Sequence, residues 1–257
     1  MIIKNDYPIL EYSTEKTAII NPERFAKEEP VPRLCLVTFF GEVLKEAVEK
    51  YKGTVIGTYV SEMRDFPLYR LEVDGMEVCA IQAVVASGSI AMLTDWLYGG
   101  GVEVIVCCGA CGVLDDIPAG DVIIPVRALR DEGASYHYLP PARFVELPER
   151  PVECFRHVLD GHRIPYIECA TWSTDGFCRE TREMADHRKQ EGCKVVEMEC
   201  AAMAAVAQFR GKMFGQLLYS GDILTGNADE YDERDWNHNV TARERLFDLA
   251  LEALCML

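Results

Sequence analysis

The chain has 257 residues, of which 49% are hydrophobic, so it can bury a full core and is not a disordered polypeptide. Its 26 Lys and Arg stand against 42 Asp and Glu, and the resulting formal charge of −16 argues against partners such as nucleic acid or an anionic membrane. No apolar stretch approaches the roughly 20 residues that a membrane span requires, and the first residues lack the order of a secretory signal. The composition predicts a soluble globular protein.

The eleven cysteines could suggest a disulfide framework, but their number is odd and several lie in apolar, strand-like runs. A free thiol in such a run behaves as a small hydrophobic group, and a chain of this length does not need disulfides to be stable. We therefore expect reduced thiols and a cytoplasmic location. Cys108 and Cys111 form a CxxC pair, but no helix dipole and no further metal ligands accompany it, so we expect neither a redox centre nor a metal site.

The predicted elements alternate between strands and helices, as is typical of α/β proteins. From residue 34 onwards, strands are expected at 34–39, 54–60, 68–73, 76–85, 102–108, 121–128, 164–170 and 214–219, and helices at 42–50, 88–98, 180–190, 201–209 and 246–257. Asp74 and Gly75 are typical of a two-residue hairpin turn. The pattern predicts one three-layer α/β/α domain with a central mixed sheet over 34–257, preceded by an N-terminal arm over 1–33.

Three segments carry candidate functional residues. Residues 107–112 close a buried strand with two glycines, which suits either a tight turn or backbone N–H groups that face a ligand at the sheet edge. Glu197 and Glu199 lie where a short strand meets an Ala-rich helix, so they could bind two ribose hydroxyls or only favour the helix start. Asp222 follows the last strand, where a turn residue is the default interpretation.

In combination these segments resemble the nucleoside phosphorylase superfamily, of the purine nucleoside and uridine phosphorylase type. The most specific similarity is Glu-Met-Glu at 197–199, which resembles the ribose motif of the family. Residues 108–112 resemble the glycine turn, 120–124 the strand after it, and 131–140 a loop of the uridine phosphorylases. Several similar segments in the same order make a chance match improbable.

The resemblance implies a three-layer domain in homodimers or trimer-of-dimers hexamers, which cleaves an N-glycosidic bond with inorganic phosphate as co-substrate and no other cofactor. It gives the base-protonating role to Asp222 as general acid. Arg64 resembles an arginine that reaches a neighbouring subunit's phosphate. The other implied contacts are ribose at Glu197, Met198 and Glu199, the base at Phe177, Cys111 and Gly112, and phosphate at Gly109 and Ala110.

The similarity fails at the phosphate end. The first phosphate loop of the family is replaced by residues 38–43, and Cys107 stands where an arginine is expected. A bidentate arginine–phosphate contact is strong, and a thiol cannot replace it. Pro8 stands in place of a partner histidine, and Thr181 and Glu183 replace the residues that bind uracil. As substitutes for the lost arginines the sequence offers only three candidates on rough location, Arg33, Arg127 and Arg130.

Three hypotheses follow. A nucleoside phosphorylase ranks first, with a purine favoured by Asp222 and uridine kept open by the uridine-like segments. A nucleosidase, in which water replaces phosphate, explains the lost arginines, and Glu42 lies within one residue of the position of a water-activating glutamate in such enzymes. A non-catalytic nucleoside-binding relative ranks third, because Glu199, Phe177 and Asp222 are all retained.

Overall fold

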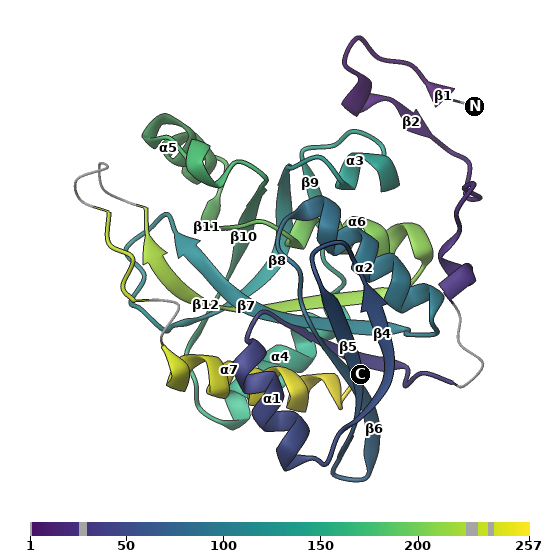
Figure 1. Ribbon diagram of the computed structural model, residues 1–257. Coiled ribbons are helices and arrows are strands. Elements are labelled where there is room, and N and C mark those ends of the chain that lie inside the picture. Colours follow the sequence, from purple (N-terminus) through teal and green to yellow (C-terminus); the bar gives the residue numbers. More distant parts are fainter. Residues whose placement is uncertain (1, 26–29, 225–230, 236–238) are drawn as a thin grey trace.

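The computed structural model describes residues 2–25, 30–224, 231–235 and 239–257, and its centre is a ten-stranded mixed sheet (Figure 1). The strands lie in the order β11-β10-β8-β12-β7-β3-β6-β5-β4, with β9 paired to β8. Their bounds are β3 (Leu34–Thr38), β4 (Thr54–Val60), β5 (Asp65–Val73), β6 (Met76–Gln82), β7 (Val104–Val113), β8 (Val122–Asp131), β9 (Phe144–Glu146), β10 (Tyr166–Thr174), β11 (Cys193–Glu197) and β12 (Met213–Ile223).

Helices cover both faces of the sheet, which gives the predicted three layers (Figure 1). On one face α2 (Ser87–Gly99) and α6 (Cys200–Arg210) pack together over one apolar cluster, with α3 (Ser135–Tyr138) beside α6. On the other face α1 (Gly41–Lys50), α4 (Glu149–Gly161) and α7 (Val240–Leu254) cover a second cluster, and α5 (Arg182–Gln190) lies beside β11. The prediction of a single mixed α/β domain is confirmed.

Local sequence explains these elements. Helix α6 is Ala-rich and buried along most of its length because it lies between α2 and the sheet. Helix α7 buries one side only, as expected from its spacing of leucine and alanine. Asp74 and Gly75 both have positive φ angles, 50° and 81°, and join β5 to β6, so the predicted hairpin turn is confirmed.

The glycine turn expected at 107–112 is wrong, because β7 continues through this segment to Val113 and pairs with β12 along it. Glycine is needed there for close packing between elements. A Cβ on Gly112 would lie 2.5 Å from Leu224 Cδ1 and 3.0 Å from Val196 Cγ1, and one on Gly109 would lie 2.8 Å from Phe39 Cδ2. Tertiary pairing has thus overridden the turn tendency of two glycines.

The end of β12 also differs from the prediction, because Asp222 was expected in a turn after the strand. Asp222 belongs to β12, which extends to Ile223. Strand β11 pairs with β10 and also with β7, through Val195 opposite Val113 and Val196 opposite Gly112. This extra pairing folds one end of the sheet back on itself. It brings the Glu-Met-Glu segment beside the ends of β7 and β12, although the three segments are far apart in sequence.

The N-terminal segment lies along the helical layer above the sheet in Figure 1. It contains the hairpin β1 (Ile2–Ile3) with β2 (Tyr12–Ser13) and two short 3-10 helices, η1 (Pro8–Leu10) and η2 (Pro22–Phe25). The buried Tyr12 donates a hydrogen bond to Tyr138 O at 3.4 Å. Residues 1 and 26–29 of the predicted arm are outside the described ranges. Within those ranges, no helix has the length and apolarity needed to cross a membrane.

Candidate functional site

A cavity of about 270 Å³ opens at the carboxyl ends of β3, β7 and β11. Parallel α/β sheets commonly bind ligands at this edge. Eight predicted site residues line the cavity, namely Ala110, Cys111, Gly112, Phe177, Glu197, Met198, Glu199 and Asp222. It is also lined by side chains to which the sequence analysis gave no role, among them Phe40, Glu180, Gln216 and Arg243.

Glu197 is a buried carboxylate that the surrounding chain already satisfies. Its Oε2 accepts from the backbone N–H groups of Glu199 at 2.7 Å and Cys200 at 2.6 Å, and its Oε1 accepts from the hydroxyls of Ser173 and Thr171. Burial raises the pKa of Glu197, and these four hydrogen bonds oppose that shift. Glu197 therefore fixes the start of α6 against β10, with its lone pairs used inside the protein.

Glu199 is equally buried but less satisfied. Its Oε1 accepts from Ala86 N at 2.7 Å, and its Oε2 accepts from Met198 N at 3.3 Å. Ala86 has a φ of 75°, a conformation that alanine rarely adopts, and such strain is often found at functional sites. Burial, and then the charge of Glu197, raise the pKa of Glu199 to about 8. A carboxyl group with one bond per oxygen can accept further hydrogen bonds from a vicinal diol.

Asp222 and Glu180 form a second acidic group in the cavity. Tyr231 Oη donates to Asp222 Oδ2 at 3.2 Å, and Asp222 Oδ1 lies against Gly112. Burial raises the pKa of Asp222 and is opposed by this hydrogen bond. Burial and the neighbouring Asp222 also raise the pKa of Glu180 to about 7. A carboxyl group whose pKa is raised towards neutrality can donate a proton in catalysis.

Phe177 lies at the mouth of the cavity on η3 (Phe177–Arg179), and its side chain is 58% exposed. An exposed aromatic ring at a cavity edge is suited to stacking on a flat heterocycle. Cys111 and Gly112 line the same cavity, so the residues predicted to contact the base are brought together. Cys108 and Cys111 are both free thiols on β7, three residues apart, and so face opposite sides of the strand and do not form a redox pair.

The phosphate end departs from the prediction. Gly109 is not among the lining residues, because Phe39 packs over it. Arg64 is exposed outside the cavity, where its guanidinium lies 4.5 Å from the Phe66 ring centre and donates to Gln82 Oε1. Arg243 of α7 lines the cavity instead, and it is ion-paired with Glu42. The predicted role of Arg64 is to reach the phosphate of a neighbouring subunit. Its position outside this cavity does not test that role, which stays a prediction.

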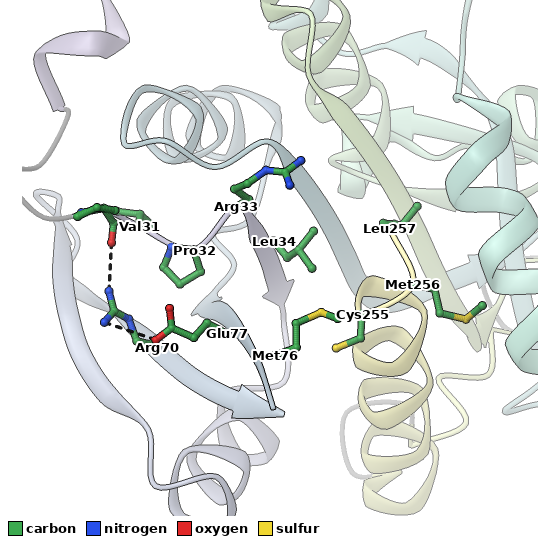
Figure 2. A pocket seen from close by; sticks show the side chains of 11 residues that line it. Val31, Pro32, Arg33, Leu34, Arg70, Met76, Glu77, Cys255, Met256 and Leu257 are labelled. Carbon is green, nitrogen blue, oxygen red and sulfur yellow. Dashed lines mark hydrogen bonds and ion pairs between the residues drawn. The ribbon is translucent and has the colours of Figure 1, made fainter. Parts of the chain in front are cut away.

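None of the three arginines considered as substitutes lines this cavity. Arg127 lies over the Phe144 ring, and Arg130 is buried and donates to Ser135 and to the backbone of the 131–140 loop. Arg33 lies at the amino end of β3, beside another cavity of about 670 Å³ (Figure 2). In Figure 2 Arg70 is held by Glu77 while Arg33 points away from both.

Comparison with known proteins agrees with this geometry. Residues 33–254 match the family model of the phosphorylase superfamily. The chain belongs to this superfamily. A guanosine phosphorylase of Halorubrum lacusprofundi is 26% identical over 183 residues, which cover 68% of this chain and 74% of the relative.

Solved structures of other proteins have the same fold as this chain. A uridine phosphorylase from Vibrio fischeri ES114 superposes with a TM-score of 0.75 at 19% identity, over 90% of this chain and 95% of that one. An AMP nucleosidase from Bacteroides thetaiotaomicron VPI-5482 superposes with a TM-score of 0.71 at 20% identity, over 91% and 92%. The resemblance found in the sequence is thus confirmed at the level of the nucleoside phosphorylase and nucleosidase family.

Some residues that line the phosphorylase-superfamily cavity were missed from the sequence. Gln216 could have been found, since it is a polar residue inside the apolar run 214–219. Arg243 gave no such indication, because it precedes the helix expected at 246–257 and an arginine outside the apolar runs is ordinarily a surface residue. Among the described residues no cluster of His, Cys, Asp and Glu is arranged to hold a metal ion.

Proposed function

We propose that the protein cleaves the N-glycosidic bond of a purine nucleoside with inorganic phosphate, releasing the free base and a (deoxy)ribose 1-phosphate. The observation that carries this proposal is the pair Glu199 and Asp222. They line one cavity, both have a raised pKa, and only Glu199 lies beside the helix start fixed by Glu197. One carboxyl is suited to bind the ribose diol and the other to protonate the leaving base.

Two of the steps, the binding of the sugar and the protonation of the base, have residues in the cavity to perform them. Glu199 accepts hydrogen bonds from the 2′- and 3′-hydroxyls, with the backbone of Met198 beside it, and so fixes the sugar. A phosphate oxygen forms a bond to the anomeric carbon while the carbon–nitrogen bond breaks. The electron pair of the broken bond moves to the base. Asp222, held by Tyr231, donates a proton to the purine ring nitrogen and neutralises the departing base.

A purine is the better substrate class for this cavity. Asp222 and Phe177 line it, and they could supply a proton to a purine ring nitrogen and a stacking surface at the mouth. Thr181 and Glu183, which stand where uridine phosphorylases would bind uracil, do not line the cavity. The Halorubrum relative is named a guanosine phosphorylase, which agrees with a 6-oxopurine nucleoside.

The test is an incubation with guanosine, inosine, adenosine and uridine, each with and without phosphate, followed by an assay of free base and sugar 1-phosphate. We expect purine release that depends on phosphate and yields the sugar phosphate in equal amount. Release of uracil alone would refute the purine assignment, and release without phosphate would refute phosphorolysis.

Hydrolysis is the second candidate, and the Glu42–Arg243 ion pair favours it. Arg243 is the single arginine among the described lining residues, and Glu42 already neutralises it, while four carboxyl groups line the same cavity. Water needs no cation, and Glu42 could accept its proton. Glu42→Gln separates the two: phosphorolysis should keep its rate and use phosphate at lower concentration, because Arg243 is released, whereas hydrolysis should lose its base and slow by ~10²-fold or more.

The remaining expectations are part of the same proposal. We propose that phosphate is the only co-substrate and that no other cofactor is needed. The assembly is a homodimer or a trimer of dimers, in which a neighbour could supply Arg64. The reduced state of the eleven free cysteines suits a cytoplasmic enzyme. Residues 34–257 would form the catalytic domain and 1–33 the arm.

A further inference from the structure

Gln216 is the least satisfied polar side chain of the cavity. It lies on β12 with no exposed surface, and neither its Oε1 nor its Nε2 has a hydrogen-bond partner in the described part of the chain. It lines the cavity, and it pairs in register with Cys107 of β7. A buried amide without partners destabilises the folded protein unless a ligand or water binds to it. This side chain therefore marks a position at which the cavity is built for a polar ligand.

The N-terminus of α1 lies at the same wall. Phe40 is the N-cap residue of this ten-residue helix and lines the cavity, and within the described ranges no side chain caps the first turn. The first N–H groups of a helix have no partner inside the helix, and the helix dipole makes this end attractive to anions. An anion bound beside Phe40 would therefore meet hydrogen-bond donors from the backbone.

Arg243 brings a cation to this wall from the last helix. Its side chain is only 13% exposed, and its guanidinium carbon lies 4.9 Å from the centre of the Phe40 ring. The ion pair with Glu42 places Arg243 against the first turn of α1. Since Glu42 is 45% exposed, its carboxylate can turn to solvent when a stronger anion takes its place.

We propose that Gln216, Arg243 and the N-terminus of α1 together bind the attacking phosphate, in place of the arginines that this chain lacks. The proposal rests on the phosphorolysis proposed above. Gln216 Nε2 and the Arg243 guanidinium donate to phosphate oxygens, and Gln216 Oε1 accepts the hydrogen bond of the single P–OH group. Phosphate enters by displacing Glu42 from Arg243.

Steady-state kinetics of two variants test this assignment. Gln216→Leu keeps the size of the buried side chain and removes both polar atoms, and we expect it to raise the KM for phosphate about tenfold. Arg243→Gln should raise it about 100-fold, because a charged bidentate contact is lost. The KM for the nucleoside should change less than about threefold. Arg245→Gln is the matched control, since Arg245 lies exposed on the same helix outside the cavity, and both constants should stay unchanged.

Binding of inorganic phosphate to the whole protein, followed by ³¹P NMR, keeps the assignment testable whatever the reaction is. The proposed phosphate subsite is supported if the wild-type protein binds phosphate and both variants bind it less tightly. If that result is obtained but no nucleoside is cleaved, only the proposed function fails. The subsite is refuted if wild type does not bind phosphate. It is equally refuted if cleavage depends on phosphate and neither variant changes the KM for phosphate.

Discussion

The two ends of the cavity are built in different ways. At the end that we propose for the ribose, Glu197 holds the start of α6 through four hydrogen bonds, and Glu199 is fixed by two backbone N–H groups. At the end that we propose for phosphate, Phe40 lies at the start of a helix that no described side chain caps. There Gln216 has no partner among the described residues, and Arg243 is paired with a half-exposed glutamate.

This difference teaches where a site can change without loss of the fold. The two carboxylates of the proposed ribose end are bound within the folded core, so a substitution at Glu197 would disturb a strand and a helix as well as any ligand. At the proposed phosphate end, Phe40 is part of the core, but the cation comes from a distant helix. A cation supplied from α7 can therefore take the place of one supplied from β7, as long as it reaches the same space.

The largest expected effect is at neither of these ends but at the base. Asp222→Asn should lower kcat for purine cleavage by about 10²–10⁴-fold, because the amide cannot donate a proton to the leaving base. The KM for the nucleoside should change little, since Glu199 still binds the sugar. Single-turnover measurement of base release gives the rate directly, and an unchanged rate would remove Asp222 from the acid role.

Stability distinguishes the two glutamates of the ribose end. Glu197→Ala should destabilise the protein by about 2–4 kcal/mol, because it leaves two backbone N–H groups and two hydroxyls buried without their acceptor. Glu199→Ala should cost less stability but abolish detectable nucleoside binding. Urea unfolding and nucleoside titration of both variants measure the contrast. Equal losses of stability would contradict the separate roles of the two residues.

The raised pKa of Glu199 gives a pH dependence of stability. This carboxyl ionises at about pH 8 in the folded protein but near 4.5 when unfolded, so the folded state binds more protons between these values. Stability should therefore fall as the pH rises from 5 to 8, by up to about 1.4 kcal/mol per pH unit for this proton. Thermal unfolding over this range should show a flatter profile in Glu199→Gln, and identical profiles would argue against the shift.

The smallest expected effect is at the mouth of the cavity. Phe177→Leu should raise the KM for a purine nucleoside about tenfold through the loss of ring stacking. Because the ring is 58% exposed, stability should stay within about 0.5 kcal/mol of wild type. Kinetics and unfolding of the same preparation test both statements, and a large loss of stability would show that Phe177 is a packing residue.

Much of the fold could be predicted from local pattern. The strand at 54–60 was predicted to the residue, and the helices at 42–50 and 201–209 were predicted within one residue at each end. Errors occur where long-range pairing decides, as in β7, which runs through two glycines because β11 and β12 pair with it. The residues predicted to bind the ribose and the base do line one cavity, and the sequence pointed to them because they form a contiguous, similar segment or a countable spacing.

The sequence by itself determined the α/β class, the order of most elements and three of the four acidic residues that line the cavity, because periodicity and short motifs are local properties. Only the tertiary structure decided which of two neighbouring glutamates is free for a ligand, since that depends on hydroxyls of β10. It also decided that Arg243 of α7 and Gln216 of β12 share a cavity with Phe40. Phe40 and Arg243 are some 200 positions apart in the sequence, and they come together through packing of the elements. A local sequence pattern does not predict such contacts.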